Sequence, residues 1–304
     1  YFGDTHVHTK LSLDTFRDGS NRVTAGQAYR FARGEPVRMR NGMTAKLQRP
    51  LDFLVVADHA EGMGLMDGLW NSDASMSQIE SAKALRDRFK RIQLNKDREV
   101  QSQSLWQLEL DMWSGNIGRE KGYRQSVWES VTATADKYNA PGKFTAFSGY
   151  EWSSWGEKLD LSALSNLHRV VIFKDNAERT NQILPFSPID SGNPENLWAF
   201  FESYQQKTGG EVLAIPHNGN LSRGQMFALV DFAGQPLSKS YAERRSHWEP
   251  LFEVTQAKGD SESHPILSRD DPFSNYETWN DWSRESEKHT EDTNWDNWPQ
   301  EKKN

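Results

Sequence analysis

The chain has 304 residues, with 36 Lys and Arg against 43 Asp and Glu, so its formal net charge is −7. This acidic balance, without a long Lys/Arg stripe, argues against a nucleic-acid binder. The chain has no Cys, so any metal ion must bind His and carboxylate side chains. No apolar run approaches the roughly 18 residues of a membrane span. We expect a soluble protein of one large domain or two small ones.

The chain starts at Tyr1, one residue before strand-like sequence and without Met. A removed signal peptide accounts for this start, and so does artificial trimming. We therefore expect a periplasmic or secreted address, with the cytoplasm as the open alternative. The sequence carries no signal for an oligomeric state.

Short apolar runs alternate with longer stretches at helical spacing, which is typical of an α/β fold. Thr24 and Gln27 make a capping box at the start of one predicted helix, and Pro194 precedes another. In chain order, the predicted elements are strand 2–7, helix 24–33, strand 51–57, helix 78–94, helix 122–138, strands 144–150 and 169–173, helix 195–204, and strands 212–215 and 251–254.

Two stretches do not fit a simple alternation of strands and helices. Residues 34–49 are basic and hairpin-like, and residues 62–116 are largely helical. We interpret both as insertions that leave the carboxyl ends of strands and form a lid. We expect residues 1–257 to form one domain of this α/β type. Residues 258–304 are rich in Trp and poor in aliphatic residues. Because Trp is costly to leave in water, we expect this segment to wrap over the domain, or else to lead to further strands.

His6 and His8 flank Val7 at the end of the first predicted strand, in GDTHVHTKLSLD. Residues i and i+2 of a strand point to the same face, so the two imidazoles lie side by side. A His-x-His pair alone is weak evidence for a metal ion, because ordinary surface or hydrogen-bonded histidines are more common.

The same placement recurs at the ends of three further predicted strands. Asp58 and His59 follow LDFLVVA, Glu151 follows KFTAFSGY, and His217 follows EVLAIP. Active sites of parallel sheets and barrels form at the carboxyl ends of strands, so these side chains predict a metal site. His168 differs because it precedes its strand, and the pattern alone does not place it with the others.

The ligand types narrow the choice of metal. Imidazole and carboxylate without thiolate favour Zn, Mn or Fe over Ca. The candidate ligands exceed the needs of one tetrahedral ion, so we expect two or three divalent ions that share a bridging carboxylate. Clustered ions lower the pKa of a bound water and supply hydroxide as nucleophile, so no Ser or Cys nucleophile is required.

The motifs HVHTKLSLD, ADHA, GYE and IPHN follow one another in this order. Together they resemble the polymerase-and-histidinol-phosphatase (PHP) domain, and more closely the PHP-like domain-of-unknown-function family 3604. The match in motif order covers residues 2–220. The resemblance implies a distorted (β/α)7 TIM-like barrel with a trinuclear metal site that hydrolyses phosphomonoesters or phosphodiesters.

The resemblance also implies metal ligands and catalytic residues. Glu151 would bridge the first two ions, and Asp58, His59 and Glu151 are the predicted catalytic residues. Asp58 either orients a ligand or a water, or merely caps its strand. The implied ligands are His6, His8 and Glu151 for the first ion, His168 and His217 with Glu151 for the second, and Asp14 and His59 for the third.

The chain departs from the PHP pattern at its end. PHP sites finish with an Asp-x-His motif on a late strand, and no Asp-x-His follows His217. The nearest residues, in KGDSESHP, have a different spacing. Either the final barrel strands are missing from this chain, or the site is reduced to two ions.

The substrate contacts are harder to predict. Lys10, Arg169 and Arg223 lie close in sequence to the ligands and could meet phosphate oxygens, although each could also be a solvated surface charge. We expect a phosphoesterase acting on a small phosphorylated ester. Two alternatives stay open, namely amide, ester or lactone hydrolysis by the same metals, and a catalytically silent binding module.

Overall fold

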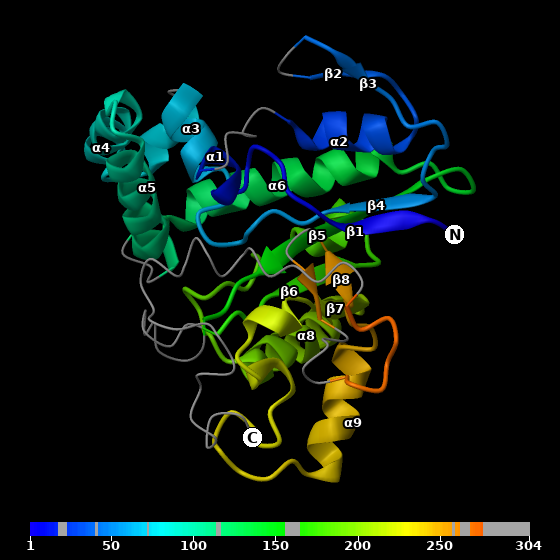
Figure 1. The fold of residues 1–304 in the computed structure, drawn as a ribbon. Helices are drawn as coiled ribbons and strands as arrows, with labels where there is room; N and C mark the ends of the chain where they lie inside the picture. Colours follow the sequence, from blue (N-terminus) through cyan, green and yellow to red (C-terminus); the bar gives the residue numbers. More distant parts are fainter. Residues whose placement is uncertain are drawn as a thin grey trace.

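The computed structural model shows a mixed α/β fold around one curled five-stranded sheet, with the strand order β1-β4-β5-β6-β7 (Figure 1). These strands span Gly3–Val7 (β1), Phe53–Val56 (β4), Thr145–Trp152 (β5), Arg169–Phe173 (β6) and Val212–Pro216 (β7). The structure describes residues 1–17, 23–39, 42–71, 73–113, 117–155, 165–256, 259–261 and 268–275.

Strand direction explains how the sheet gathers the predicted ligands. Strands β1, β4 and β5 run parallel, β6 is antiparallel to β5, and β7 is antiparallel to β6. The carboxyl ends of β1, β4, β5 and β7 therefore meet at one end of the sheet. Because β6 runs the opposite way, it begins at that end. His168, which precedes β6, thus lies beside residues that follow the other strands.

Helices cover the sheet and extend beyond it (Figure 1). They span Asp14–Arg17 (α1), Ala25–Ala32 (α2), Leu65–Asn71 (α3), Ala82–Leu94 (α4), Arg98–Trp113 (α5), Lys121–Tyr138 (α6), Ala177–Thr180 (α7), Pro194–Thr208 (α8) and Lys239–Trp248 (α9), with 3-10 turns at Ala74–Gln78 (η1), Gly219–Leu221 (η2) and Gln225–Phe227 (η3). Helices α2 and α6 pack near β4 and β5, whereas α8 and α9 pack near β7. None of the helices in the described ranges has the length and apolar character to cross a bilayer.

The core is aromatic where α6 and α8 meet β5 and β6. Trp128 packs edge-to-face on Tyr150, and Phe173 packs on Tyr204 in the same way. All four side chains are at most 1% exposed. Burial of such a side chain stabilises the fold by roughly 1.5–3 kcal/mol, which holds β5 and β6 firmly beneath the site.

Most predicted strands and helices are confirmed, with shifted ends. The capping box at Thr24 and Pro194 at the first position of α8 are both present. The predicted helix 78–94 is divided into η1 and α4. The predicted strand 251–254 is wrong, because this run is only partly buried and the short antiparallel pair β8 (Thr255–Gln256) and β9 (Gly259–Asp260) follows it instead.

The two predicted insertions differ in position. Residues 34–49 contain an antiparallel pair, β2 (Val37–Arg38) and β3 (Thr44–Ala45), as expected for a hairpin, with residues 40 and 41 outside the described ranges. This hairpin joins α2 to the amino end of β4, so its predicted place in a lid at the carboxyl ends is wrong.

Residues 62–116 do follow the carboxyl end of β4 and contain α3, η1, α4 and α5. Residues 72 and 114–116 of this segment, and most of 258–304, lie outside the described residues. Leu85, Phe89 and Ile92 of α4 share an apolar cluster with Leu13 and Phe16. The helical segment is thereby attached to the loop that follows His8.

Candidate metal centre

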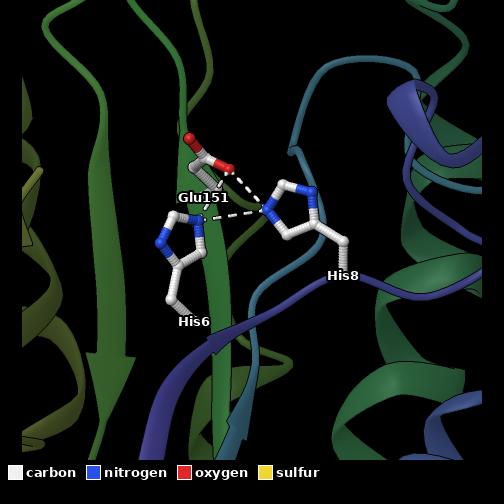
Figure 2. A group of neighbouring side chains, drawn as sticks. All are labelled: His6, His8 and Glu151. Atoms are coloured by element: carbon white, nitrogen blue, oxygen red, sulfur yellow. Dashed lines mark hydrogen bonds and ion pairs between the residues drawn. The ribbon is translucent and has the colours of Figure 1, made fainter. Parts of the chain in front are cut away.

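Glu151 lies at the centre of a group of imidazoles at the carboxyl end of the sheet. Its Oε2 is 2.7 Å from His8 Nε2 and 3.3 Å from His6 Nε2. Its Oε1 is 2.7 Å from His168 Nδ1 and 2.8 Å from His217 Nε2. Figure 2 shows the His6 and His8 rings turned toward this carboxylate, which is 1% exposed.

His59 and Asp14 extend this group. His59 follows β4 and forms a backbone bridge with Glu151, while Asp14 begins α1. His59 Nε2 lies 3.5 Å from Glu151 Oε2 and 4.0 Å from Asp14 Oδ2. Asp14 Oδ2 is in turn 2.8 Å from His8 Nδ1. The structure therefore brings all the predicted ligands together, and we call them the Glu151 cluster: His6, His8, Asp14, His59, Glu151, His168 and His217.

Three groups of donor atoms within this cluster are spaced to hold a metal ion, with the atoms of each group within 4.8 Å of one another. The groups are His6, His8 and Glu151; His8, Asp14 and His59; and His59, Glu151 and His168. Because the groups share members, ions bound in them would lie close together. His168 groups with His59 here, whereas the resemblance paired His168 with His217.

Burial and charge fix the protonation of the inner residues. Burial raises the pKa of Glu151, but His59, His217 and His8 outweigh this and hold it well below its ordinary value. Burial lowers the pKa of His59 to about 3 and moves that of His217 well below its ordinary value. At neutral pH Glu151 is therefore ionised, and His59 and His217 are neutral, as metal ligands must be.

His6 and His8 behave in the opposite way. Burial lowers the pKa of His8, but the carboxylates of Asp14 and Glu151 raise it well above its ordinary value. Glu151 and Glu253 likewise outweigh burial and raise the pKa of His6. His6 and His8 therefore hold protons more strongly than an ordinary His does. A divalent metal ion that binds these rings would have to displace those protons.

The spacing of these donor atoms is compatible with a bound metal ion. His6 Nε2 and His8 Nε2 lie 3.2 Å apart and both face Glu151 Oε2, so these three atoms converge on one point. Glu253 Oε1 is buried and has no hydrogen-bond partner among the described residues. A buried carboxylate oxygen without a donor is costly, and a nearby cation offsets that cost.

Sequence reasoning missed three residues around the cluster. Glu253 Oε2 lies 3.1 Å from His6 Nδ1, and no sequence signal pointed to it. Ser153 Oγ lies 2.6 Å from His59 Nδ1 and 2.6 Å from Glu61 Oε1. Glu61 and Ser153 each come two positions after a predicted ligand, and this i+2 spacing is a signal that could have found them.

Asp58 has the structural role that the sequence left open. Its Oδ1 accepts a hydrogen bond from the Thr9 backbone N–H at 2.5 Å, and its Oδ2 accepts one from Thr9 Oγ1 at 2.8 Å. Burial raises the pKa of Asp58 to about 6, although these bonds oppose the shift. The carboxylate thus ties the loop after β1 to β4. Its catalytic role stays a prediction.

The three predicted phosphate contacts have different positions. Arg169 is wrong as a substrate contact, because its guanidinium is 2% exposed and forms an ion pair with Glu249 at 3.0 Å. Lys10 Nζ forms an ion pair with Asp67 Oδ2 at 2.8 Å, beside a cavity that no residue of the Glu151 cluster lines. Arg223 is exposed in the segment after β7 and stays a prediction.

Comparisons with known proteins place the chain in a family without giving it an activity. No curated protein and no solved structure matches the chain. The model of a family described as "Protein of unknown function (DUF3604)" matches residues 1–298, which include the whole Glu151 cluster. The chain therefore belongs to the DUF3604 family.

Proposed function

We propose that this protein is a metal-dependent hydrolase with a di- or trinuclear centre and that its substrates are phosphate esters. The observation that carries the proposal is the contact of one buried carboxylate, Glu151, with four imidazoles, within a cluster that contains three overlapping donor groups. An overlapping set of this kind is suited to more than one ion.

Glu151 would bridge neighbouring ions, and the imidazoles around it would hold them. When bound, divalent ions of the Zn, Mn or Fe type would lower the pKa of a water and neutralise charge on a phosphoryl group. In the reaction, the water oxygen bonds to phosphorus, the ester P–O bond breaks, and the leaving alcohol takes a proton. The exposed Arg223 is the remaining candidate for contact with phosphate oxygens.

We also propose that the curled sheet is part of a distorted (β/α)7 barrel of the PHP type. The resemblance of the four motifs supports this, and so does the strand order. Among the described strands, β1 pairs only with β4 and β7 pairs only with β6, so both sides of the sheet have room for further strands.

The test is a parallel assay of p-nitrophenyl phosphate, bis(p-nitrophenyl) phosphate and p-nitrophenyl acetate with added Mn or Zn. We expect cleavage of a phosphate ester that needs the metal and is lost in His59→Ala, with circular dichroism showing an unchanged fold. Dominant acetate cleavage would favour the amide, ester or lactone alternative. Bound metal without turnover of any substrate would favour the binding module.

A further inference from the structure

A chain of three buried side chains runs from the Glu151 cluster into the protein. His59 Nδ1 lies 2.6 Å from Ser153 Oγ, and Ser153 Oγ lies 2.6 Å from Glu61 Oε1. Glu61 and Ser153 are both 0% exposed, and His59 is 6% exposed. Glu61 and Ser153 belong to none of the three donor groups. The proposed hydrolysis does not use them.

The hydroxyl of Ser153 is a necessary link in this chain. The direct distance from His59 Nδ1 to Glu61 Oε1 is 3.4 Å, which is beyond the roughly 2.7–3.2 Å of a good N–H···O hydrogen bond. Ser153 spans this gap with two short contacts. It can do so because a hydroxyl donates one hydrogen bond and accepts others.

The direction of these hydrogen bonds fixes the position of one proton. Ser153 Oγ–H donates to Glu61 Oε1, so Ser153 Oγ has only lone pairs to offer to His59 Nδ1. His59 Nδ1 must therefore carry the proton and donate it to Ser153. In a neutral ring the lone pair is then on Nε2, the nitrogen that lies 3.5 Å from Glu151 Oε2.

We propose that Glu61 and Ser153 are positioning residues that hold His59 in the tautomer whose Nε2 lone pair faces the metal centre. The inference rests on the proposed metal-dependent function and deepens it. In the other tautomer, an N–H would point at the ions and would prevent His59 from binding them. Loss of such an outer partner typically lowers metal affinity by about 10–100-fold.

His59 differs in this respect from the histidines of β1 and the loop after it. Carboxylates contact His6 Nδ1 and His8 Nδ1 directly, at 3.1 Å from Glu253 and 2.8 Å from Asp14. Ser12 Oγ also lies 3.3 Å from His8 Nδ1, but His8 keeps its direct carboxylate contact, whereas Ser153 makes the closest contact of His59 Nδ1. Removal of one hydroxyl should therefore release the His59 tautomer and leave the other two rings in place.

The test uses the full chain with ¹⁵N-labelled histidine. Nitrogen NMR of the metal-free protein shows which ring nitrogen carries the proton, and the signals that vanish in His59→Gln assign His59. Zinc affinity is then measured by chelator competition for the wild type, Ser153→Ala and Ser148→Ala. Ser148 is the matched control, because it is a buried serine on β5 whose Oγ has no hydrogen-bond partner among the described residues.

We expect a proton on His59 Nδ1 in the wild type and in Ser148→Ala, and a mixture of tautomers in Ser153→Ala. We also expect Ser153→Ala to bind zinc about 10–100-fold more weakly than the control. A wild-type proton on His59 Nε2 would overturn the inference, even if Ser153→Ala does not fold. Unchanged zinc affinity in a folded Ser153→Ala would overturn it too. Absence of phosphoesterase turnover would count against the proposed function alone, because neither readout is an activity.

Discussion

Two buried charged clusters adjoin β6, and the carboxylates at their centres face different partners. In the first, Glu249 Oε1 accepts hydrogen bonds from Arg169 Nε at 3.0 Å and Trp198 Nε1 at 2.9 Å, and Glu249 Oε2 accepts one from Arg245 Nε at 3.0 Å. Permanent cations thus neutralise the buried carboxylate. We call these four residues the Glu249 cluster.

In the Glu151 cluster the carboxylate faces imidazoles instead of guanidinium groups. Burial holds the pKa of His59 and His217 below the ordinary value, whereas nearby carboxylates raise the pKa of His6 and His8. Unlike guanidinium groups, these imidazoles can gain or lose their protons in the ordinary pH range. The comparison teaches that Arg gives a buried carboxylate a permanent counter-charge, whereas His surrounds it with donor atoms that could also bind a metal ion.

The largest expected effect is a loss of protein stability when the Glu249 cluster is disrupted. Glu249→Gln leaves Arg169 buried without its anionic partner, so it should lower the free energy of unfolding by about 3–5 kcal/mol. Urea denaturation of metal-free protein measures this. Glu211→Gln, at an exposed pair with Lys174, is the control and should change little. Equal midpoints for both variants would mean that the Glu249 cluster is not a stabilising element.

The second expected effect is a loss of zinc affinity when the Glu151 cluster, but not the Glu249 cluster, is changed. Glu151→Gln removes the carboxylate shared by two of the donor groups, so zinc affinity should fall by more than the roughly 100-fold upper range for outer partners. Chelator competition gives the affinity. Folded Glu249→Gln should bind zinc as the wild type does. Retention of tight zinc binding by Glu151→Gln would contradict the assignment of Glu151 as a bridging ligand.

A third effect is the dependence of metal binding on pH. The raised pKa values of His6 and His8 mean that both rings hold protons more strongly than usual, and a metal ion must displace those protons. Affinity should therefore fall as the pH falls, by about tenfold per pH unit for each displaced proton. Calorimetry in two buffers of different ionisation enthalpy measures the released protons. Identical heats in the two buffers would rule out this release.

The smallest expected effect concerns Lys10. Its ion pair with Asp67 is partly exposed, so Lys10→Ala should change the free energy of unfolding by less than about 1 kcal/mol. Zinc affinity and turnover of phosphate esters should not change. A large increase in KM for a phosphate ester would instead restore Lys10 as a substrate contact.

The sequence predicted most of the sheet and every residue of the Glu151 cluster. Apolar runs gave the strands and polar residues at strand ends gave most of the cluster, whereas Asp14 came from the resemblance to the PHP domain. His168 was uncertain because the direction of β6 is set by long-range pairing. Glu253 was missed for the same reason, since it meets His6 from 247 positions away in the chain.

Arg169 shows how sequence proximity can mislead. It follows His168 directly, and this suggested a shared site. Neighbouring residues of a strand point to opposite faces, so Arg169 joins Glu249 while His168 joins Glu151. The predicted position of the hairpin at residues 34–49 was wrong for a different reason. Its turn signals indicated a hairpin but did not indicate which end of a strand it adjoins.

The position of β1 has a consequence for how the Glu151 cluster opens. Among the described strands, β1 pairs only with β4, and the register of this pairing shifts between Asp4 and Val7. A strand that is paired on one side and interrupted in register opens locally at a lower free energy than global unfolding requires. Fraying would withdraw His6 and His8 together, so a bound ion would act as a clasp, and amide hydrogen exchange along β1 should slow when metal is added.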